Sequence, residues 1–314
     1  MRILITGVSG FIGAHAARRL VEKGYEVHGV VRSRPPILLE YFSVSDKVEL
    51  WKADIRDAQR LLDVFKEVKP DVVFHFAAQA NVKPALEAAM ETAEINVLGT
   101  VAVLEACRKV GATLYLNSTD KALGAQNGAE ENTRYEPAEP YGSSKAAAEL
   151  FARAYERLYR MPIVIIRHCN AYGLDLGPRI VPNTIRACLR GERPVIWREN
   201  KNYRRQYIYI EDLLDAYELL LENGVTSGVW HFGTPDVLTN GEVVRTVCEH
   251  FGVEPVYGER PKDRIHNIPS QWLDYRKAIF ELGFSPKFSF KKGIKQTIEE
   301  FKRFYERYPH LLRS

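Results

Sequence analysis

Three glycines near the start of the chain constrain its fold more than any other feature. The apolar run RILIT is followed by Gly7, Gly10 and Gly13, and Gly13 falls inside the start of an expected helix. A glycine can adopt positive φ in a tight turn, and it lets a phosphate or a second backbone approach closely. The amides of the helix N-terminus would then face the phosphates. The stretch therefore predicts a strand, turn and helix that bind a dinucleotide, although glycine is also an ordinary turn residue.

The first half of the chain alternates apolar, β-branched runs with helical patterns. Several runs are apolar at every position, as in parallel strands that are covered on both faces. This alternation predicts an α/β fold with a doubly wound parallel sheet. We expect strands over residues 3–6, 26–31, 48–52, 71–76, 113–117 and 163–167, and helices over 12–23, 58–68, 84–110 and 141–159.

The pattern changes near residue 168, where Gly, Pro and Arg interrupt the chain. We expect a helix over 212–222, a strand near 228–233 and a last amphipathic helix over 291–308. The sequence therefore predicts a first domain over 1–167, with return segments near 206–232, and a smaller second domain over 168–314.

Composition argues against several classes of function. The formal net charge is only +4 over 314 residues, and no basic block is interleaved with aromatic residues, so we expect no nucleic-acid partner. No apolar run approaches ~18 residues and no signal peptide is recognised, so we expect no membrane association. The four cysteines lack metal-binding spacing, which indicates a reducing compartment. A cytoplasmic protein without a metal is expected, with His75 as a hydrogen-bonded core residue.

The stretch YGSSK is a candidate catalytic motif. It places Tyr141 and Lys145 four positions apart, on one face of an expected helix. A nearby ammonium lowers the pKa of a tyrosine hydroxyl from its reference value of about 10, which suits the tyrosinate to general base catalysis. The alternative interpretation is a solvated helix face.

As a set, the motifs resemble the extended branch of the short-chain dehydrogenase/reductase superfamily, the nucleotide-sugar epimerases and dehydratases. The resemblance covers essentially the whole chain and rests on TGVSGFIG, KADIRD, FHFAAQ, INVLGT, YGSSK, IRHCNAYG, RRQYIYIEDLLDAY and KAIFELGFSP. It implies a Rossmann-type sheet, a smaller C-terminal substrate-binding domain, and a homodimer formed by a four-helix bundle of the helices over 84–110 and 141–159. The implied cofactor contacts are Gly7, Gly10, Phe11, Ile12, Gly13, Asp54, Ile55, Ala77, Ala78, Gln79, Asn96, Tyr141 and Lys145.

The end of the second expected strand bears on the choice of cofactor. An acidic residue about 20 positions past the glycines would bind the ribose 2′-hydroxyl of NAD. This chain has Arg32, Ser33 and Arg34 there instead. Because arginine pairs well with a 2′-phosphate, Arg32 and Arg34 favour NADP, with NAD as the alternative. The two arginines could also belong to a solvated loop.

The stretch LNSTDKALG bears on the reaction. The resemblance places the active-site hydroxyl on Thr119, so that Thr119, Tyr141 and Lys145 form the catalytic triad. The 4-epimerases of the family usually have small, uncharged residues at the next two positions, whereas the 4,6-dehydratases have an acid and a base. Asp120 is therefore the expected acid and Lys121 the expected base, similar to CDP-glucose and GDP-mannose 4,6-dehydratases.

Other interpretations remain open at this stage. Asp120 and Lys121 could form a local ion pair in an enzyme that is a 4-epimerase or a 4-keto reductase, and the chain length is closer to that of an epimerase. A non-catalytic NADP-binding regulator is the remaining alternative, although such relatives usually lose Tyr141 or Lys145. For a nucleotide-sugar substrate, the resemblance implies contacts from Asn170, Arg179, Asn183, Arg205 and Arg264. Gln206 stands where the family usually has Asp.

Overall fold

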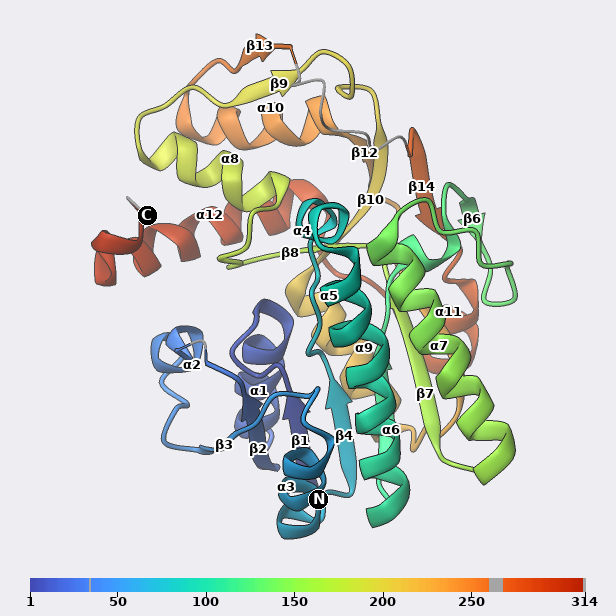
Figure 1. Cartoon of the computed structure of the whole chain (residues 1–314). Coiled ribbons are helices and arrows are strands. Elements are labelled where there is room, and N and C mark those ends of the chain that lie inside the picture. Colours follow the sequence, from blue (N-terminus) through green and yellow to red (C-terminus); the bar gives the residue numbers. More distant parts are fainter. Residues whose placement is uncertain (34, 260–267, 313–314) are drawn as a thin grey trace. The chain divides into compact units, whose positions relative to one another are not determined.

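The computed structural model describes residues 1–33, 35–259 and 268–312 (Figure 1). The chain forms two compact units. Unit 1 contains the described residues of Met1–Gly124, Glu131–Arg167 and Tyr217–His231, and unit 2 contains those of Ala125–Glu130, His168–Ala216 and Phe232–Ser314. The units differ from the expected domains in that 125–130 belongs to unit 2 and the returning segment is shorter than 206–232.

Unit 1 is built on a seven-stranded sheet in the order β11-β7-β5-β4-β1-β2-β3. The neighbouring pairs from β3 to β7 are parallel. This order is that of a doubly wound dinucleotide-binding sheet, in which ligands bind at the carboxyl ends of the strands. The predicted fold class is therefore confirmed. The strands are β1 (Arg2–Thr6), β2 (Glu26–Val31), β3 (Val48–Lys52), β4 (Val72–His75), β5 (Thr113–Asn117), β7 (Ile163–His168) and β11 (Gly228–Phe232).

Helices cover both faces of this sheet. On one face, α3 and α6 share a buried core with the strands, in which Phe65, Leu104 and Leu114 are completely buried. On the other face, α1 is tied to the end of α9 by an ion pair between Arg19 and Glu218 (3.1 Å). The helices contributed wholly or partly to unit 1 are α1 (Phe11–Glu22), α2 (Ile37–Tyr41), α3 (Ala58–Val68), α4 (Val82–Glu87), α5 (Ala89–Ala93), α6 (Gly99–Val110), α7 (Pro140–Tyr159) and α9 (Ile210–Glu222), with a 3-10 turn η2 (Asp120–Leu123).

The expectation of one helix over 84–110 is wrong in its first part. Ala88 has φ −139° and ψ 63°, outside the helical region, and it separates α4 from α5. The π-helical segment η1 (Glu94–Leu98) then joins α5 to α6. In this region the hydroxyl of Thr100 donates to the carbonyl oxygen of Asn96 (2.6 Å), which occupies an acceptor of the regular helical pattern. A π-helical turn of this kind often marks a functional position.

Unit 2 contains a second, smaller sheet in the order β12-β10-β14-β6, with β8 also paired to β10. A separate pair is formed by β13 and β9. Helix α10 begins with a capping box, in which Thr239 and Glu242 satisfy each other's backbone amides. The strands are β6 (Asn127–Ala129), β8 (Asn170–Tyr172), β9 (Val195–Trp197), β10 (Arg204–Tyr209), β12 (Val237–Thr239), β13 (Val256–Gly258) and β14 (Ser270–Leu273). The helices are α8 (Ile180–Leu189), α10 (Asn240–Phe251), α11 (Arg276–Leu282) and α12 (Phe290–Arg307), and η3 (Pro309–Leu312) is a 3-10 turn.

Candidate active site

The glycine-rich turn has no room for side chains. Gly7 has φ +74°, and a Cβ atom there would lie 2.7 Å from the backbone nitrogen of Ala77. A Cβ on Gly13 would collide with the carbonyl oxygen of Gly7, and one on Gly10 would lie 3.2 Å from that oxygen. Helix α1 begins directly after this turn, at Phe11, and no side chain caps it. The bare turn and the uncapped amides fit a dinucleotide diphosphate.

Basic side chains lie near the carboxyl ends of β2 and β3. Asp54 follows β3, and its carboxylate accepts hydrogen bonds from the Nε (3.1 Å) and Nη2 (2.7 Å) atoms of Arg56. This hydrogen bonding to Arg56, with a smaller contribution from the charge of Arg32, holds the pKa of Asp54 below its usual value. Ile55 is buried. Arg34 lies outside the described residues.

The loop after β4 is fixed by the π-helical segment. The backbone nitrogen of Gln79 donates to Oδ1 of Asn96 (2.8 Å), and Nδ2 of Asn96 donates to the carbonyl oxygen of Gln79 (3.0 Å). The same Nδ2 atom donates to the hydroxyl of Ser144 in α7 (2.8 Å). Asn96 therefore holds the loop 77–79, which also contains Ala77 and Ala78, against the helix that carries Tyr141 and Lys145.

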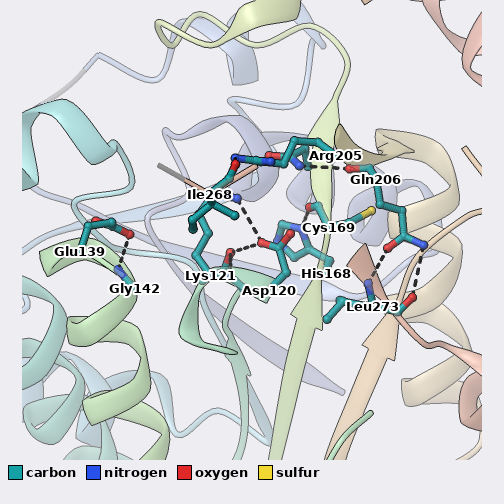
Figure 2. A network of polar contacts seen from close by, with 12 residues as sticks. Asp120, Lys121, Glu139, Gly142, His168, Cys169, Arg205, Gln206, Ile268 and Leu273 are labelled. Carbon is teal, nitrogen blue, oxygen red and sulfur yellow. Dashed lines mark hydrogen bonds and ion pairs between the residues drawn. The ribbon is translucent and has the colours of Figure 1, made fainter. Parts of the chain in front are cut away.

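The turn after β5 contains a chain of polar contacts (Figure 2). The hydroxyl of Thr119 donates to Oδ1 of Asp120 (3.0 Å), and the ammonium of Lys121 donates to the same oxygen (3.1 Å). Asp120 is completely buried, whereas the Lys121 side chain is 17% exposed. The structure thus brings together the three residues expected on this turn, and it joins Asp120 and Lys121 as an ion pair.

Helix α7 carries the predicted Tyr-Lys pair. Glu139 caps the helix, since its carboxylate accepts the backbone N–H groups of Tyr141 (2.7 Å) and Gly142 (2.8 Å). A Cβ atom on Gly142 would lie 2.5 Å from the carbonyl oxygen of Lys121, so that this glycine allows the helix to pack against the turn. Figure 2 shows Glu139 and Gly142 beside Lys121.

Lys145 is buried and points at the end of β5. Its ammonium donates to the carbonyl oxygen of Asn117 (2.7 Å), two residues before Thr119. Burial lowers the pKa of Lys145 to about 8, and the charge of Glu149 opposes this shift. The lysine is therefore held within the same local structure as Thr119, but in an environment that weakens its hold on the proton.

Sequence reasoning missed a buried polar cluster behind Lys145. The carboxylate of Glu149 accepts hydrogen bonds from the hydroxyl of Ser118, from the hydroxyl of Tyr135 (2.9 Å) and from Nη2 of Arg167 (2.7 Å). Glu149 and Arg167 are both completely buried. The spacing of Glu149 from Lys145, four residues along the same helix, together with an arginine in an apolar strand, could have indicated this cluster.

The residues expected to bind substrate that the structure describes lie in unit 2, and several have partners there. Arg179 forms an ion pair with Asp175. The side-chain oxygen of Asn183 accepts a hydrogen bond from Arg186 (2.6 Å). Nδ2 of Asn170 donates to the carbonyl oxygen of Gln206 (3.1 Å).

Arg205 is anchored by backbone carbonyls. Its Nη1 and Nη2 atoms donate to the carbonyl oxygens of Arg204 (2.8 Å) and Ile268 (2.6 Å). The neighbouring Gln206 donates to the carbonyl oxygen of Thr234 and accepts from the backbone nitrogen of Leu273, a contact drawn in Figure 2. A glutamine can do both at this position, whereas a carboxylate could only accept. Arg264 lies outside the described residues.

The described part of the chain shows no group of three or more His, Cys, Asp or Glu side chains that could hold a metal ion. No helix within it is long and apolar enough to cross a membrane.

Comparisons with known proteins identify the family. The model of the family described as GDP-mannose 4,6 dehydratase matches residues 4–297. A putative UDP-glucose 4-epimerase of Methanocaldococcus jannaschii is 30% identical, over 96% of this chain and 98% of the relative. A trifunctional UDP-glucose 4,6-dehydratase, 3,5-epimerase and reductase of Arabidopsis thaliana is 30% identical over 95% of this chain. The chain spans only 46% of the length of that relative.

Solved structures agree with this assignment. The dTDP-glucose 4,6-dehydratase of Streptomyces venezuelae, with NAD bound, has a TM-score of 0.90 at 28% identity, over 99% of this chain and 100% of that chain. The UDP-glucose 4-epimerase of Thermus thermophilus in complex with NAD has a TM-score of 0.87 at 30% identity, over 96% of this chain and 99% of that chain. The chain therefore belongs to the GDP-mannose 4,6-dehydratase family, within the extended short-chain dehydrogenase/reductases.

Proposed function

We propose that this chain is an NADP-dependent nucleotide-sugar 4,6-dehydratase. The observation that carries the proposal is the Asp120–Lys121 ion pair directly beside Thr119, on the turn that packs against helix α7. An acid and a base at this place are what elimination of water requires, whereas a 4-epimerase needs neither. The curated relatives include both dTDP-glucose 4,6-dehydratases and a UDP-glucose epimerase, which supports this general class of chemistry.

Each proposed residue has one task. Tyr141, as its phenolate, takes the proton of the sugar O4 hydroxyl, Lys145 four residues along the helix supplies a positive charge, and Thr119 orients that oxygen. A bound nicotinamide cofactor would supply the hydride chemistry needed at C4 and at C6. The 4-keto group acidifies the C5 proton, which Lys121 removes. Asp120 gives a proton to the O6 hydroxyl as it leaves C6 as water.

The observed ion pair adds a condition to this scheme. In the structure the Lys121 ammonium donates to Asp120, so the lysine holds the proton at rest. For Lys121 to act as a base and Asp120 as an acid, this proton must first pass along their 3.1 Å hydrogen bond. Elimination then gives the C5 proton to Lys121 and removes the proton of Asp120. The pair is then back in its resting state, and Lys121 gives a proton to C5 when hydride reaches C6. The proton that Tyr141 took from the O4 hydroxyl replaces the one that Lys121 has given, so that water is the only group lost over the whole cycle.

The proposed cofactor contacts lie in unit 1. Gly7, Gly10 and Gly13, with the amides of Phe11 and Ile12, would hold the diphosphate. The adenine end would contact Asp54 and Ile55, and the loop 77–79, held by Asn96, would line the nicotinamide side. Arg32 would pair with a 2′-phosphate, which favours NADP over NAD, although the solved relatives named above are described with NAD. Arg34 is proposed for the same role from sequence alone.

Four of the proposed substrate contacts lie in unit 2. Arg205 would reach the diphosphate of the nucleotide sugar, and Asn170, Arg179 and Asn183 would contact the sugar and base. Arg264 is proposed for the diphosphate from sequence alone. Because Arg179 and Asn183 already have partners in the structure, their hydrogen bonds would have to be shared or exchanged with the substrate.

A second copy of the chain is the proposed partner. Helix α7 exposes the apolar side chains of Leu150, Phe151 and Leu158, of which Leu158 is 71% exposed. A homodimer through α6 and α7 would cover them. Light scattering at micromolar concentration tests this expectation, and replacement of Leu158 and Leu150 by Glu should give a monomer.

A 4-epimerase or 4-keto reductase is the second candidate, favoured by the 30% identity to a putative UDP-glucose 4-epimerase. In that case the Asp120–Lys121 pair only steadies the turn. A regulator that binds NADP without catalysis is the remaining alternative. For a regulator, Tyr141→Phe should change nothing, whereas for an enzyme it should abolish turnover and leave cofactor binding intact.

Mass spectrometry of the protein with NADP and a panel of nucleotide sugars tests the proposal. The panel contains CDP-glucose, GDP-mannose, UDP-N-acetylglucosamine and dTDP-glucose. A product lighter by one water is expected, and Lys121→Gln should prevent it, while Lys109→Gln, on the exposed part of α6, should not. An isomer of unchanged mass, formed equally by the Lys121 variant, would make the protein an epimerase.

A further inference from the structure

The buried cluster around Glu149 has no part in the proposed reaction. The Glu149–Arg167 pair is completely shielded from solvent, with Nη2 of Arg167 2.7 Å from the carboxylate and Nε 3.1 and 3.0 Å from its two oxygens. Nη1 of Arg167 contacts Nε2 of His231 (3.1 Å). With the two further hydroxyl donors, the Glu149 carboxylate is fully saturated. Charge-assisted hydrogen bonds of this kind are stronger than those between neutral groups.

Stability alone is a poor explanation for such a pair. The cost of removing two charges from water often equals or exceeds their mutual attraction, so apolar residues of similar volume commonly serve as well. The cluster also has a special location. Tyr141, Lys145 and Glu149 are spaced by four residues in α7, and therefore follow one another along one face of the helix.

We propose that Glu149 is a positioning residue of the active site, whose carboxylate supplies the counter-charge that keeps the buried Lys145 ammonium protonated and directed at the carbonyl oxygen of Asn117. This inference rests on the proposed role of Lys145 in catalysis. Arg167 holds the carboxylate in place. Glu149 thus acts through Lys145 and contacts neither substrate nor cofactor.

None of the other groups named near Lys145 supplies this negative counter-charge. His75, in β4, is held neutral because burial and then the Lys145 charge lower its pKa to about 3. The hydroxyl of Tyr217, in α9, donates to the side-chain oxygen of Asn117 (2.6 Å), and burial raises its pKa well above the usual value. From η2, Asp120 is engaged by Lys121 and Thr119, and Tyr141 carries no negative charge until it ionises. From β7, Arg167 presents a positive charge.

The same carboxylate also fixes the strand end that carries Thr119. The hydroxyl of Ser118 donates to Oε1 of Glu149, and the backbone nitrogen of Ser118 donates to the carbonyl oxygen of Ile166 in β7 (2.6 Å). Since Lys145 binds the carbonyl of Asn117, both anchors hold residues directly before the catalytic threonine. The Glu149 carboxylate therefore supplies the negative charge beside Lys145 and also fixes the strand end that precedes Thr119.

A direct titration of Lys145 tests the inference. The protein is labelled with [ε-13C]lysine and titrated by NMR without any cofactor or substrate, and the Lys145 resonance is assigned with Lys145→Arg. In Glu149→Gln the protonated-to-neutral ratio of Lys145 at a given pH should fall about tenfold, because a unit charge one helical turn away has been removed. Half of Lys145 should be protonated near pH 8 in the wild type, and about a tenth in the variant.

Two further variants keep the test decisive. Tyr135→Phe removes one hydrogen bond from Glu149 but keeps both charges, so it should lower stability and leave the Lys145 titration unchanged. If Glu149→Gln does not fold, Glu149→Gln with Arg167→Met removes both buried charges. Because the loss of the Arg167 charge favours the Lys145 ammonium, the ratio should fall there in the same direction but by less than tenfold. An unchanged Lys145 titration in the folded variant would overturn the inference and leave the cluster as a structural element.

The result of the Lys145 titration does not depend on whether the proposed dehydratase reaction is found. The titration uses protein without ligands, so it stands even if the nucleotide-sugar panel gives no product. If a reaction is found, its kcat in Glu149→Gln should fall most above pH 7, where Lys145 loses its proton, and less at pH 6. A loss of kcat by the same factor at every pH contradicts the counter-charge.

Discussion

His75 offers a quantitative prediction about the acid stability of unit 1. Its Nδ1 atom lies 2.6 Å from the hydroxyl oxygen of Thr6, and its Nε2 atom 3.0 Å from that of Thr100. Because the Thr100 hydroxyl donates to the carbonyl of Asn96, it must accept from Nε2–H, and Nδ1 then accepts from Thr6. The neutral ring is thus fully bonded, and a second proton has no acceptor without rearrangement. Burial lowers the pKa of His75 to about 3.

The direction and the magnitude of this pH effect on stability follow from proton linkage. The unfolded chain binds a proton at His75 below pH 6.5, and the folded chain does not, so stability falls as the pH drops from about 6.5 towards 3. The loss is RT ln(1 + 10^(6.5 − pH)), which is about 0.2 kcal/mol at pH 7 and about 2 kcal/mol at pH 5. His75→Gln keeps two hydrogen-bonding groups but cannot titrate. Between pH 7 and pH 5 it should therefore lose about 2 kcal/mol less stability than the wild type.

Hydrogen exchange in β5, which is paired with the strand of His75, is a suitable measure of the stability of unit 1. A chain of two units need not unfold in one step, so a probe inside unit 1 is preferable to a global midpoint. Opening free energies of the Thr113–Asn117 amides are compared at the two pH values, after correction for intrinsic exchange rates. Only the difference in opening free energy between the two pH values is compared, so a uniform loss of stability in the variant does not affect the test. An identical change in both proteins would refute the argument that His75 is held neutral.

Two further predictions concern single positions. Gly13→Ala places a methyl group against the carbonyl oxygen of Gly7, so we expect a loss of about 1–3 kcal/mol in calorimetry and at least tenfold weaker NADP binding by fluorescence titration. Equal NADP affinity would show that the turn has room to relax. Gln206→Glu removes the donor to the carbonyl of Thr234 and buries a charge, so hydrogen exchange in β14 should reveal about 2–4 kcal/mol lower stability. The control Gln296→Glu, at an exposed position of α12, should leave this exchange unchanged.

Features that the sequence predicts well depend on contacts between near neighbours. The turn from Gly7 to Gly13 is an example, since a strand, three bare positions and a helix lie within a few residues. The parallel sheet follows from the alternation of apolar strands and amphipathic helices. The place of His75 in the core also follows from the buried strand that it ends, and the structure confirms it.

Features that depend on distant residues could not be predicted in this way. The break at Ala88 and the π-helical turn at Asn96 arise where one side chain binds the loop at Gln79 and the helix at Ser144 at once. Local helix propensity contains no information about either partner. The pairing of Glu149 with Arg167 joins a helix to a strand in the same manner. An arginine in an apolar strand indicates a buried partner, but nothing near it in the sequence identifies Glu149 as that partner.

The position of strand β11 affects how the protein folds during synthesis and where it can be truncated. It pairs with β7 at the edge of the unit 1 sheet, yet the chain reaches it only after residues 168–216, which belong to unit 2. During synthesis, the backbone groups on the edge of β7 that faces away from β5 therefore stay unpaired until the ribosome has passed Phe232, which takes several seconds at typical rates. A gene fragment that stops at residue 167 would encode a sheet with an open, apolar edge, which favours aggregation. A stable half-protein would need 217–231 supplied as a second segment.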